Sequence, residues 1–470
     1  MSEHVIVGAT FRALGAFPSG WRYPGAHRKP EHDARALRKA ARAAEAAKLD
    51  FLYFGDWLST GADLQYSDPD LLARFDPFSA VGFLAGITRR IGLIATANTS
   101  YSDAYTLARA SASLDRLSGG RIGLNVAVGA DPRTAANYAT VQPLTGNTRY
   151  ERADEVIDAL RLLWDSWDDG AFISDVDAGR LIDDRLLRSA AYYGQHVGVE
   201  GPLNAPRPIQ GHVPIVHAGT ALRSRELIAA RADVALAAFT NEAEAAVFRS
   251  DLRALALASG RRMDDVKLIT PVLPVVAETV EAAWRVFDTL VSLVPLDDAY
   301  GAGAGDPALP RGRGIRALSP VVGVPLGPQP LDAEVSARIA GRFDVGGRQL
   351  LATVESQTGR RVGSSRPVTY RHLLVAHIVP GTIVVGDARL VADHIQRWFE
   401  AGAVDGFSVL SAYLHEQFAA FTELVVPELQ RRGLFRTEYA GSTLREHLGL
   451  ARPPSVHSSA LSSARSGTAR

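Results

Sequence analysis

The chain of 470 residues carries 51 Lys and Arg against 51 Asp and Glu, so its formal net charge is zero, and it contains no cysteine. The lack of cysteine excludes disulfides, a cysteine–zinc site, a thiolate nucleophile and a cysteine-ligated iron–sulfur cluster. Balanced charge argues against a dedicated nucleic-acid binder, which usually has a basic surplus, while 47% hydrophobic and 22% charged residues are typical of a globular protein.

The first ten residues lack the cationic stretch, apolar core and small-residue cleavage site of a secretory signal. The longest apolar runs, such as residues 268–277, are far shorter than the roughly 18–20 residues that span a bilayer. We therefore expect a cytoplasmic protein with neither a membrane nor a nucleic acid as partner.

Short β-branched runs alternate along the chain with Ala-, Arg- and Glu-rich stretches of helical periodicity, a pattern that predicts parallel α/β architecture. The runs are continuously apolar, as expected for strands that are covered on both faces. The predicted strands are 5–9, 51–54, 91–96, 122–128, 214–218, 234–237, 267–276 and 406–410, and the helices between them include 33–48, 104–117, 152–167, 222–231 and 242–259. Eight strand–helix units predict one (β/α)8 TIM barrel.

Two stretches are too long to be plain connections, about 170–211 before the fifth strand and about 294–386 before the eighth. We interpret both as insertions into a single barrel domain of residues 1–451. The second contains a glycine-rich loop at 301–314, which does not open a helix after a strand and so predicts no dinucleotide site. Residues 452–470 are Ser- and Ala-rich and are predicted to form a disordered tail.

Polar residues stand at the carboxyl ends of the predicted strands, where barrel enzymes build their sites. Asp56 follows the second strand, Thr96 ends the third and Asn125 lies in the fourth. Gly219 and Thr220 form a turn after the fifth strand, just before a helix whose backbone N–H groups could seat a phosphate. Each residue alone could be a cap or a turn residue. Together they predict a ligand site, although composition names no ligand.

Three histidines are weak catalytic candidates. His217 lies one residue from the end of the fifth strand and could face either the pocket or the core. His372 and His377 lie in the second insertion, five residues apart, a spacing that fits neither one helix face nor one strand face. No metal site is predicted from them, and the sequence assigns no catalytic residue.

Residues 113–126, with the sequence SLDRLSGGRIGLNV, are similar to the fourth-strand signature of bacterial-luciferase-like flavin monooxygenases. Within this family, the chain resembles one subfamily more specifically. That subfamily includes nitrilotriacetate, EDTA and dibenzothiophene-sulfone monooxygenases, a long-chain alkane monooxygenase and a streptogramin-forming oxidase. The segments that carry this resemblance are 149–155 (RYERADE), 163–169 (LWDSWDD), 201–211 (GPLNAPRPIQG) and 435–450 (FRTEYAGSTLREHLGL). It covers nearly the whole chain to about residue 450 and is weakest over 299–371.

The resemblance implies a barrel that takes reduced FMN (FMNH2) from a separate NAD(P)H:flavin reductase. With O2 the flavin forms a C4a-(hydro)peroxide that oxygenates a small organic substrate, and the protein positions the cofactor and excludes water. A homo-oligomer is also implied. By position, Asp56 and Thr96 match flavin contacts, Asn125 matches an amide near the isoalloxazine edge, and Tyr150 matches a phosphate-side tyrosine. Arg149 is a further phosphate candidate because a guanidinium can grip phosphate bidentately.

The chain also departs from the family pattern. The histidine of the His-x-x-Arg-Tyr motif is Gly146, a second family histidine is Thr106, and the phosphate-binding serine is Ala221, beside which Thr220 and Ser224 could serve instead. Two alternatives therefore stay open, a deazaflavin-dependent oxidoreductase that transfers hydride and a non-catalytic flavin-binding or partner subunit. The substrate and the oxidised bond are also open.

Overall fold

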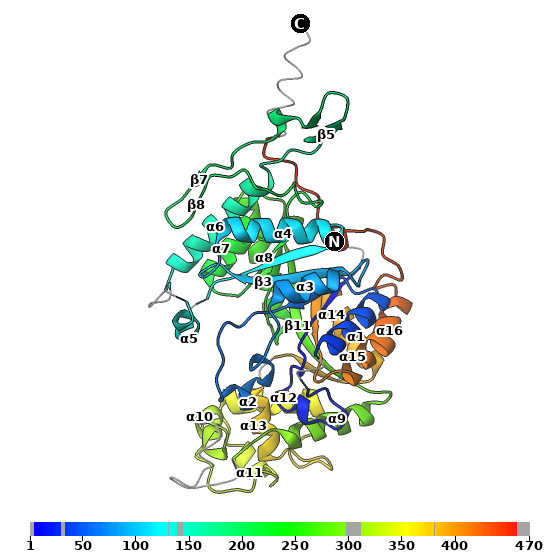
Figure 1. Ribbon diagram of the computed structural model, residues 1–470. Coiled ribbons are helices and arrows are strands. Elements are labelled where there is room, and N and C mark those ends of the chain that lie inside the picture. Colours follow the sequence, from blue (N-terminus) through cyan, green and yellow to red (C-terminus); the bar gives the residue numbers. More distant parts are fainter. Residues whose placement is uncertain are drawn as a thin grey trace.

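The computed structural model describes residues 4–29, 33–129, 131–138, 144–297, 312–379 and 381–457. Parallel strands form a closed barrel in the order β1-β2-β3-β4-β9-β10-β11-β13. Figure 1 shows β3 and β11 of the barrel with helices around them. Their bounds are β1(Ile6–Thr10), β2(Phe51–Phe54), β3(Gly92–Asn98), β4(Ile122–Ala127), β9(Ile215–Ala218), β10(Val234–Leu236), β11(Lys267–Val276) and β13(Gly406–Leu410). The ring closes where β10 pairs with β11 and β1 pairs with β13 over five residues. The predicted TIM barrel with eight strands is confirmed.

Side chains alternate between the inside and the outside of the barrel. One side chain from each of β1, β2, β3, β9, β10 and β11 fills the interior together with leucines that follow the last strand: Ile6, Phe51, Ile94, Val216, Val234, Ile269, Leu444, Leu448 and Leu450. Leu444 begins α17(Leu444–His447), which plugs the base of the barrel. Glycine is required opposite this plug, because a Cβ on Gly92 or Gly123 would lie 2.5 or 2.8 Å from a Leu444 methyl group.

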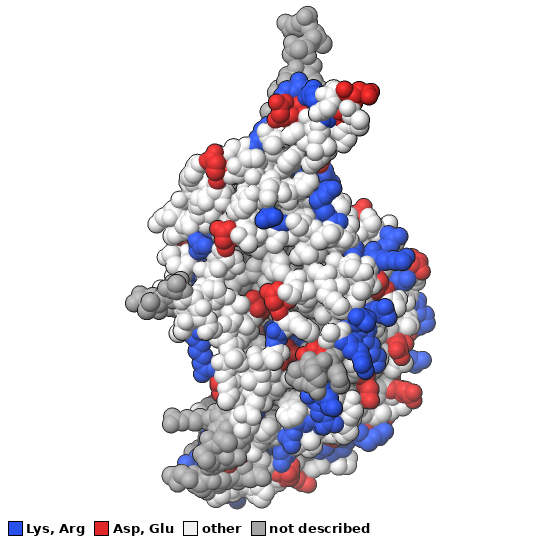
Figure 2. All heavy atoms as spheres, in the orientation of Figure 1, with Lys and Arg blue, Asp and Glu red and all other residues white. Residues whose placement is uncertain are grey.

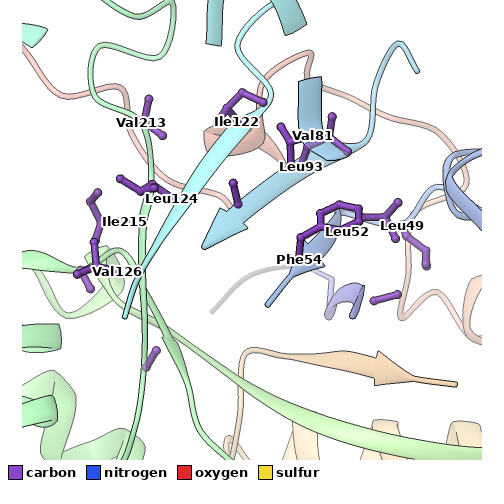
Figure 3. Close-up of a cluster of buried hydrophobic side chains, with 14 of the residues drawn as sticks. Leu49, Leu52, Phe54, Val81, Leu93, Ile122, Leu124, Val126, Val213 and Ile215 are labelled. Carbon is purple, nitrogen blue, oxygen red and sulfur yellow. The ribbon is translucent and has the colours of Figure 1, made fainter. Parts of the chain in front are cut away.

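The outward-facing side chains of the strands pack under a layer of helices. Figure 3 shows part of this layer, where Leu52, Leu93, Ile122 and Leu124 lie between the sheet and the helices. The covering helices are α1(Asp33–Ala46), α3(Pro77–Ala85), α4(Ala104–Ser118), α6(Thr148–Trp164), α7(Leu222–Arg231), α8(Glu242–Ala258), α9(Val280–Leu293) and α14(Ala388–Glu400). Shorter helices are α2(Leu64–Ser67), α5(Pro132–Ala136), α15(Glu416–Ala420) and α16(Val426–Arg431), joined by helical turns at Gly20–Arg22, Pro69–Leu71, Asp184–Leu186, Met263–Asp265, Ile315–Leu318 and Phe421–Val425.

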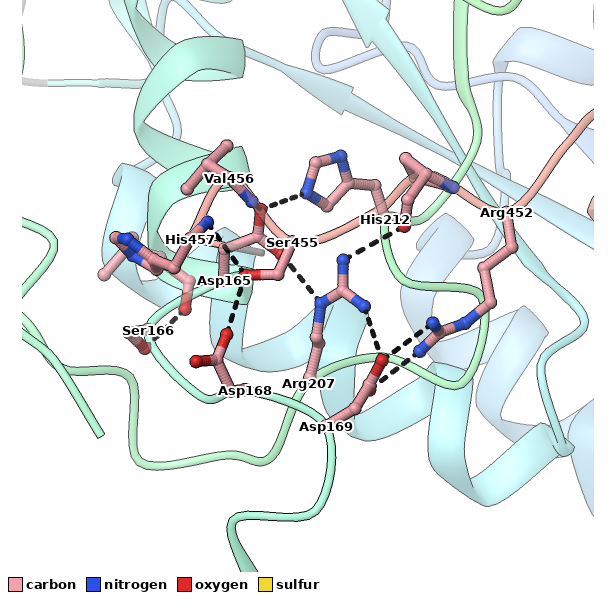
Figure 4. Close-up of polar contacts among 12 residues, drawn as sticks. Asp165, Ser166, Asp168, Asp169, Arg207, His212, Arg452, Ser455, Val456 and His457 are labelled. Atoms are coloured by element: carbon pink, nitrogen blue, oxygen red, sulfur yellow. Dashed lines mark hydrogen bonds and ion pairs between the residues drawn. The ribbon is translucent and has the colours of Figure 1, made fainter. Parts of the chain in front are cut away.

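The segment before the fifth barrel strand forms two small antiparallel hairpins. They consist of β5(Phe172–Asp175) with β6(Arg180–Ile182) and β7(Tyr192–Tyr193) with β8(Gly198–Val199). The C-terminal segment 452–457 lies against the base of this region: Arg452 binds Asp169 with both terminal nitrogens at 2.8 Å, and the Ser455 hydroxyl donates to Asp168 at 2.8 Å (Figure 4). The part of the predicted tail that the structure describes is therefore docked, and 458–470 lie outside the described residues.

The segment before the last barrel strand contains α10(Ser319–Val322), α11(Ala337–Ala340), α12(Val345–Thr358) and α13(Tyr370–Ile378), which share a small apolar core of their own. The predicted glycine-rich loop lies mostly outside the described residues. The sequence prediction missed one strand here: β12(Ile383–Gly386) pairs with the second half of β11. No helix within the described ranges is both long and apolar enough to cross a membrane.

Candidate functional site

A hydrogen-bonded cluster lies inside the barrel near the carboxyl ends of β2, β3 and β4. The Asn125 Nδ2 group donates to the Tyr53 hydroxyl at 2.9 Å and to the Thr96 hydroxyl at 3.1 Å, and the Thr96 hydroxyl donates to the Phe54 carbonyl at 2.7 Å. The register pairs Thr96 directly with Asn125. The predicted residues Thr96 and Asn125 are thus brought together.

The cluster leaves two hydrogen-bonding groups for a ligand. Asn125 Oδ1 is buried and has no hydrogen-bond partner among the described residues, which is costly for a buried acceptor. Burial raises the pKa of Tyr53, so its phenol stays protonated, and because its oxygen accepts from Asn125 its own O–H can donate elsewhere. An acceptor and a donor side by side suit an imide edge, which offers an N–H beside carbonyl oxygens.

Sequence reasoning missed Tyr53. Its signal was the two-residue period of a strand, which places Tyr53 on the same face as Phe51, and Phe51 lies in the barrel interior.

A second polar group lies at the start of α7, next to the end of β9. The Tyr150 and Ser224 hydroxyls are 3.1 Å apart and both residues are buried. Gly219 has φ +146°, and a Cβ there would lie 2.6 Å from Ser224 Oγ, so glycine lets the turn approach this hydroxyl. Ala221 is the N-cap residue of α7 and supplies no side-chain cap. No side chain of the N-cap residue binds the first N–H groups of the helix, and a helix start of this kind suits an anion.

Arg149 adds a positive charge to this group. Its guanidinium lies over the Tyr150 ring, 5.1 Å from the centroid, and its buried Nε has no partner among the described residues. The neighbouring Arg223 is different, because it forms ion pairs with Glu226 and Asp154. Arg149, Tyr150, Ser224 and the start of α7 together form what we call the anion seat. Thr220 is exposed beside it.

His217 lies between the cluster and the anion seat but faces the helix layer. Its Nδ1 donates to the Val126 carbonyl at 2.7 Å, where β4 and β9 have ceased to pair, and its ring meets Tyr150 edge-on at 6.2 Å. Burial lowers the pKa of His217. The ring is therefore neutral, and its Nε2 is an acceptor that has no partner among the described residues.

The other two histidines are held within the second insertion. His372 is buried, with its Nδ1 2.7 Å from the Thr369 hydroxyl and its Nε2 3.5 Å from Asp288 of α9. His377 is exposed on α13. Neither histidine makes a hydrogen bond to the strand-end cluster in the part of the chain that the structure describes.

Asp56 lies just beyond β2, at the rim rather than in the cluster. It accepts a hydrogen bond of 2.9 Å from the Trp57 backbone N–H, and burial raises its pKa. The same rim exposes Trp57 and Tyr138, and Tyr138 stacks on Tyr101 with ring centroids 4.4 Å apart. The Tyr101 hydroxyl is buried and without a partner among the described residues.

The departures from the family pattern fall on exposed positions. Gly146 is exposed with φ +55°, and a Cβ there would contact nothing, while Thr106 is exposed in the first turn of α4. Beside the anion seat, a cavity of about 590 Å³ opens between α7 and α8, with Thr220, Arg225 and Phe239 in its walls. Among the described residues no group of three acidic or histidine side chains could hold a metal ion.

Comparison with known proteins identifies the family of this chain. The family described as luciferase-like monooxygenase matches residues 17–405. The chain belongs to the luciferase-like monooxygenase family. It is 35% identical to nitrilotriacetate monooxygenase component A of Aminobacter aminovorans and 34% identical to N-acetyl-S-(2-succino)cysteine monooxygenase of Bacillus subtilis, in both cases over 96% of this chain and 98% of the relative. EDTA monooxygenase from Chelativorans sp. BNC1 has a similar structure, with a TM-score of 0.75 and 27% identity over 96% of this chain and 99% of that one.

This luciferase-like monooxygenase is therefore an enzyme that uses reduced flavin, and the predicted subfamily is confirmed. The residues present fit a flavin on their own chemistry. The unpartnered Asn125 Oδ1 and the Tyr53 phenol suit the imide edge of the ring, and the anion seat suits a phosphate.

Proposed function

We propose that this luciferase-like monooxygenase is the oxygenating component of a two-component system, which takes FMNH2 from a separate reductase and uses O2 to oxygenate a small organic substrate. The observation that carries the proposal is the unpartnered Asn125 Oδ1 inside the barrel, with a separate anion seat on the neighbouring strand and helix. Asn125 pairs in register with Val216 of β9, and β9 leads into α7. FMN carries an imide edge and a phosphate, one group for each of these two places.

The residues would divide the cofactor between them. Asn125 Oδ1 would accept from the ring N3–H, and the Tyr53 phenol would donate to a ring carbonyl, while Thr96 holds the amide in place through its 3.1 Å contact. The phosphate would be held by Tyr150, Ser224 and Arg149. Ser224 would then serve in place of the serine that is absent at Ala221. Asp56 stays a flavin contact by position only.

Reduced flavin supplies the activation of O2 when it is bound, so the chain needs no metal or nucleophile of its own for that step. The chain's task is to hold the ring, to keep water away and to place the substrate. The barrel interior below the cluster suits this, because Phe51, Ile94 and Val216 close it with apolar side chains.

The rim favours an apolar or singly charged substrate over a polyanion. Its arginines are neutralised, since Arg12 pairs with Asp68 and Arg74 pairs with Asp70 at 2.7 Å, and Asp56 adds a further carboxylate. Trp57, at 44% exposure, is left as an aromatic surface.

A separate reductase is supported by the name of one relative, nitrilotriacetate monooxygenase component A, which marks that protein as one part of a larger system. Pristinamycin IIA synthase of Streptomyces pristinaespiralis likewise consists of more than one chain, and two of its chains are similar to this one. The homo-oligomer implied by the family stays a prediction.

The proposal is tested by titrating the protein anaerobically with FMNH2 and then admitting O2. We expect saturable binding, followed by a transient absorbance near the boundary of the ultraviolet and visible ranges. A parallel titration with a reduced deazaflavin tests the alternative of hydride transfer. Binding of the deazaflavin but not of FMNH2 would refute the proposal in favour of that alternative. Asp56→Ala reports whether the rim carboxylate contributes to flavin affinity.

A further inference from the structure

A second cavity of about 520 Å³ lies at the base of the barrel, on the face opposite the strand-end cluster. Asp233 precedes β10 and Asp265 precedes β11, and both lie in its wall, which fixes it at the amino ends of the strands. Its other walls come from α6 and from the C-terminal segment after α17. We call this cavity the basal groove. Its volume is within the range of pockets that bind small molecules.

Positive charge is in surplus in the basal groove. Arg161, Arg261 and Arg445 all lie around a single carboxylate, Asp233. Arg445 binds Asp233 at 3.2 Å, and Arg261 comes within 3.9 Å of it, whereas Arg161 has no ion pair among the described residues. Asp158 beside Arg161 is paired with Arg231, and Asp265 beside Arg261 is paired with Arg262. Asp233 is thus the one carboxylate that the three guanidiniums share, and positive charge exceeds negative charge here. On the face shown in Figure 2, by contrast, acidic and basic side chains are interspersed over α1 and α16.

The other charged residues of the basal groove do not remove this surplus. Arg262 is matched by Asp265 at 2.9 Å, and Arg452 is matched by Asp169. Figure 4 shows that Asp169 also binds Arg207, and that Asp165 accepts from Arg207, from His212 and from the Val456 backbone. The nearby carboxylates are thus already paired with groups other than Arg161, Arg261 and Arg445.

Arg161 has donors to spare. Its Nη2 donates to the Arg231 carbonyl at 2.6 Å, while its Nε and Nη1 have no protein acceptor among the described residues. A buried side-chain nitrogen without an acceptor would stand out as unsatisfied, and neither of these two does. Both groups are therefore accessible from the groove. Burial lowers the pKa of Arg161 and of Arg261, as expected for cations that lack sufficient counter-charge.

The plain alternative is that these arginines only hold the end of α7. Arg261 alone donates to three carbonyls there, those of Ile228, Ala229 and Ala232. That role uses Arg261 and one nitrogen of Arg161, but it explains neither the remaining donors nor the cavity.

The C-terminal segment adds an apolar stretch to the wall of the basal groove. This stretch is formed by Leu450, Ala451, Pro453, Pro454 and Val456, and the Val456 side chain is 49% exposed. We propose that the basal groove binds an organic anion, whose carboxylate or phosphate head meets Arg161 in the field of Arg261 and Arg445 and whose apolar body lies against the segment 450–456. This site is separate from the flavin site proposed above.

The test is isothermal titration of the full chain with phenyl phosphate and benzoate, with benzyl alcohol as the uncharged probe and inorganic phosphate as the head group alone. We expect saturable binding of both organic anions, none of benzyl alcohol, and binding of inorganic phosphate at least about tenfold weaker. Arg161→Gln should weaken the binding of both organic anions by at least about tenfold, because it removes the free donors. Val456→Asp should do the same by placing a negative charge in the apolar wall.

Two control variants keep the result specific. Arg116→Gln removes one exposed positive charge from α4 and should change nothing. Tyr150→Phe removes a hydroxyl of the flavin anion seat, so any part of the phosphate binding that this variant weakens belongs to that seat, and the part that it leaves unchanged belongs to the basal groove. Absence of saturable binding, binding weakened by Tyr150→Phe but not by Arg161→Gln, or equal affinity for inorganic and phenyl phosphate would each overturn the proposal. Thermal melting of each variant checks that it folds.

Discussion

Tyr150→Phe removes one oxygen atom from the anion seat and leaves the ring in place. The ring is 7% exposed, and it is packed between the Arg149 guanidinium and the edge of His217. The substitution should therefore open no cavity. In the flavin-free protein it removes only the neutral hydrogen bond to Ser224 at 3.1 Å, which is worth about 1 kcal/mol.

In the complex the lost hydrogen bond is one to a charged phosphate, worth about 1.5–3 kcal/mol. After subtraction of the roughly 1 kcal/mol that the flavin-free protein also loses, the net loss of binding free energy is about 0.5–2 kcal/mol. This corresponds to a rise in the dissociation constant of FMNH2 of about 2- to 30-fold. The assay is anaerobic fluorescence titration with reduced FMN, and reduced riboflavin serves as the matched ligand because it lacks the phosphate. Riboflavin affinity should stay the same in the variant. If FMNH2 affinity were unchanged, or if riboflavin lost as much as FMNH2, the assignment of the phosphate to Tyr150 would be wrong.

Three further outcomes follow from the structure. Tyr53→Phe should weaken the binding of reduced FMN and of reduced riboflavin alike, by about tenfold, because it removes a contact to the flavin ring and the acceptor of the Asn125 amide. A loss of affinity confined to FMN would contradict the placement of Tyr53 at the ring. Gly219→Ala should destabilise the fold by about 1–3 kcal/mol and lower the affinity for FMNH2, because the new methyl group would displace Ser224. An unchanged denaturant midpoint would contradict this prediction. Burial lowers the pKa of His447 from 6.5 to about 4, so between these pH values the unfolded chain binds this proton and the folded chain does not. The free energy of unfolding should therefore fall by up to about 3 kcal/mol as the pH drops from 6.5 towards 4. Urea unfolding of His447→Gln should show a flatter pH profile.

The barrel could be predicted from the sequence because its signals are local. The strands 51–54 and 267–276 and the helix 222–231 were predicted with the bounds that the structure has. Each is a continuous apolar run or a periodic stretch between turn residues. α6 begins at Thr148 rather than at the predicted residue 152, directly after Asn147, a residue type that favours helix starts although its side chain makes no capping hydrogen bond here.

Some of the elements that escaped prediction depend on distant partners. β12 has only four residues, and it is a strand because β11 extends past the barrel to pair with it. The hairpin β5–β6 is local, but its residues are exposed apart from the half-buried Ile182, so no alternation of buried and exposed side chains marks it. At the site, Thr96 and Asn125 could be named from their strand ends, whereas Tyr53 could be recognised only once closure of the barrel set which side chains point inward.

The closure of the barrel also sets the order in which the chain can finish folding. β1 pairs with β2 through only two residues, Ala9 and Thr10, but with β13 through five. The main ladder partner of the first strand is therefore the last strand to leave the ribosome, and the plug that begins at Leu444 comes later still. Until then the nascent chain carries an unpaired strand edge and an open apolar interior, which are features that promote aggregation. Nearly complete synthesis thus precedes a closed barrel, and C-terminal truncations that remove the plug should burden the cell's chaperones more than the loss of a surface loop.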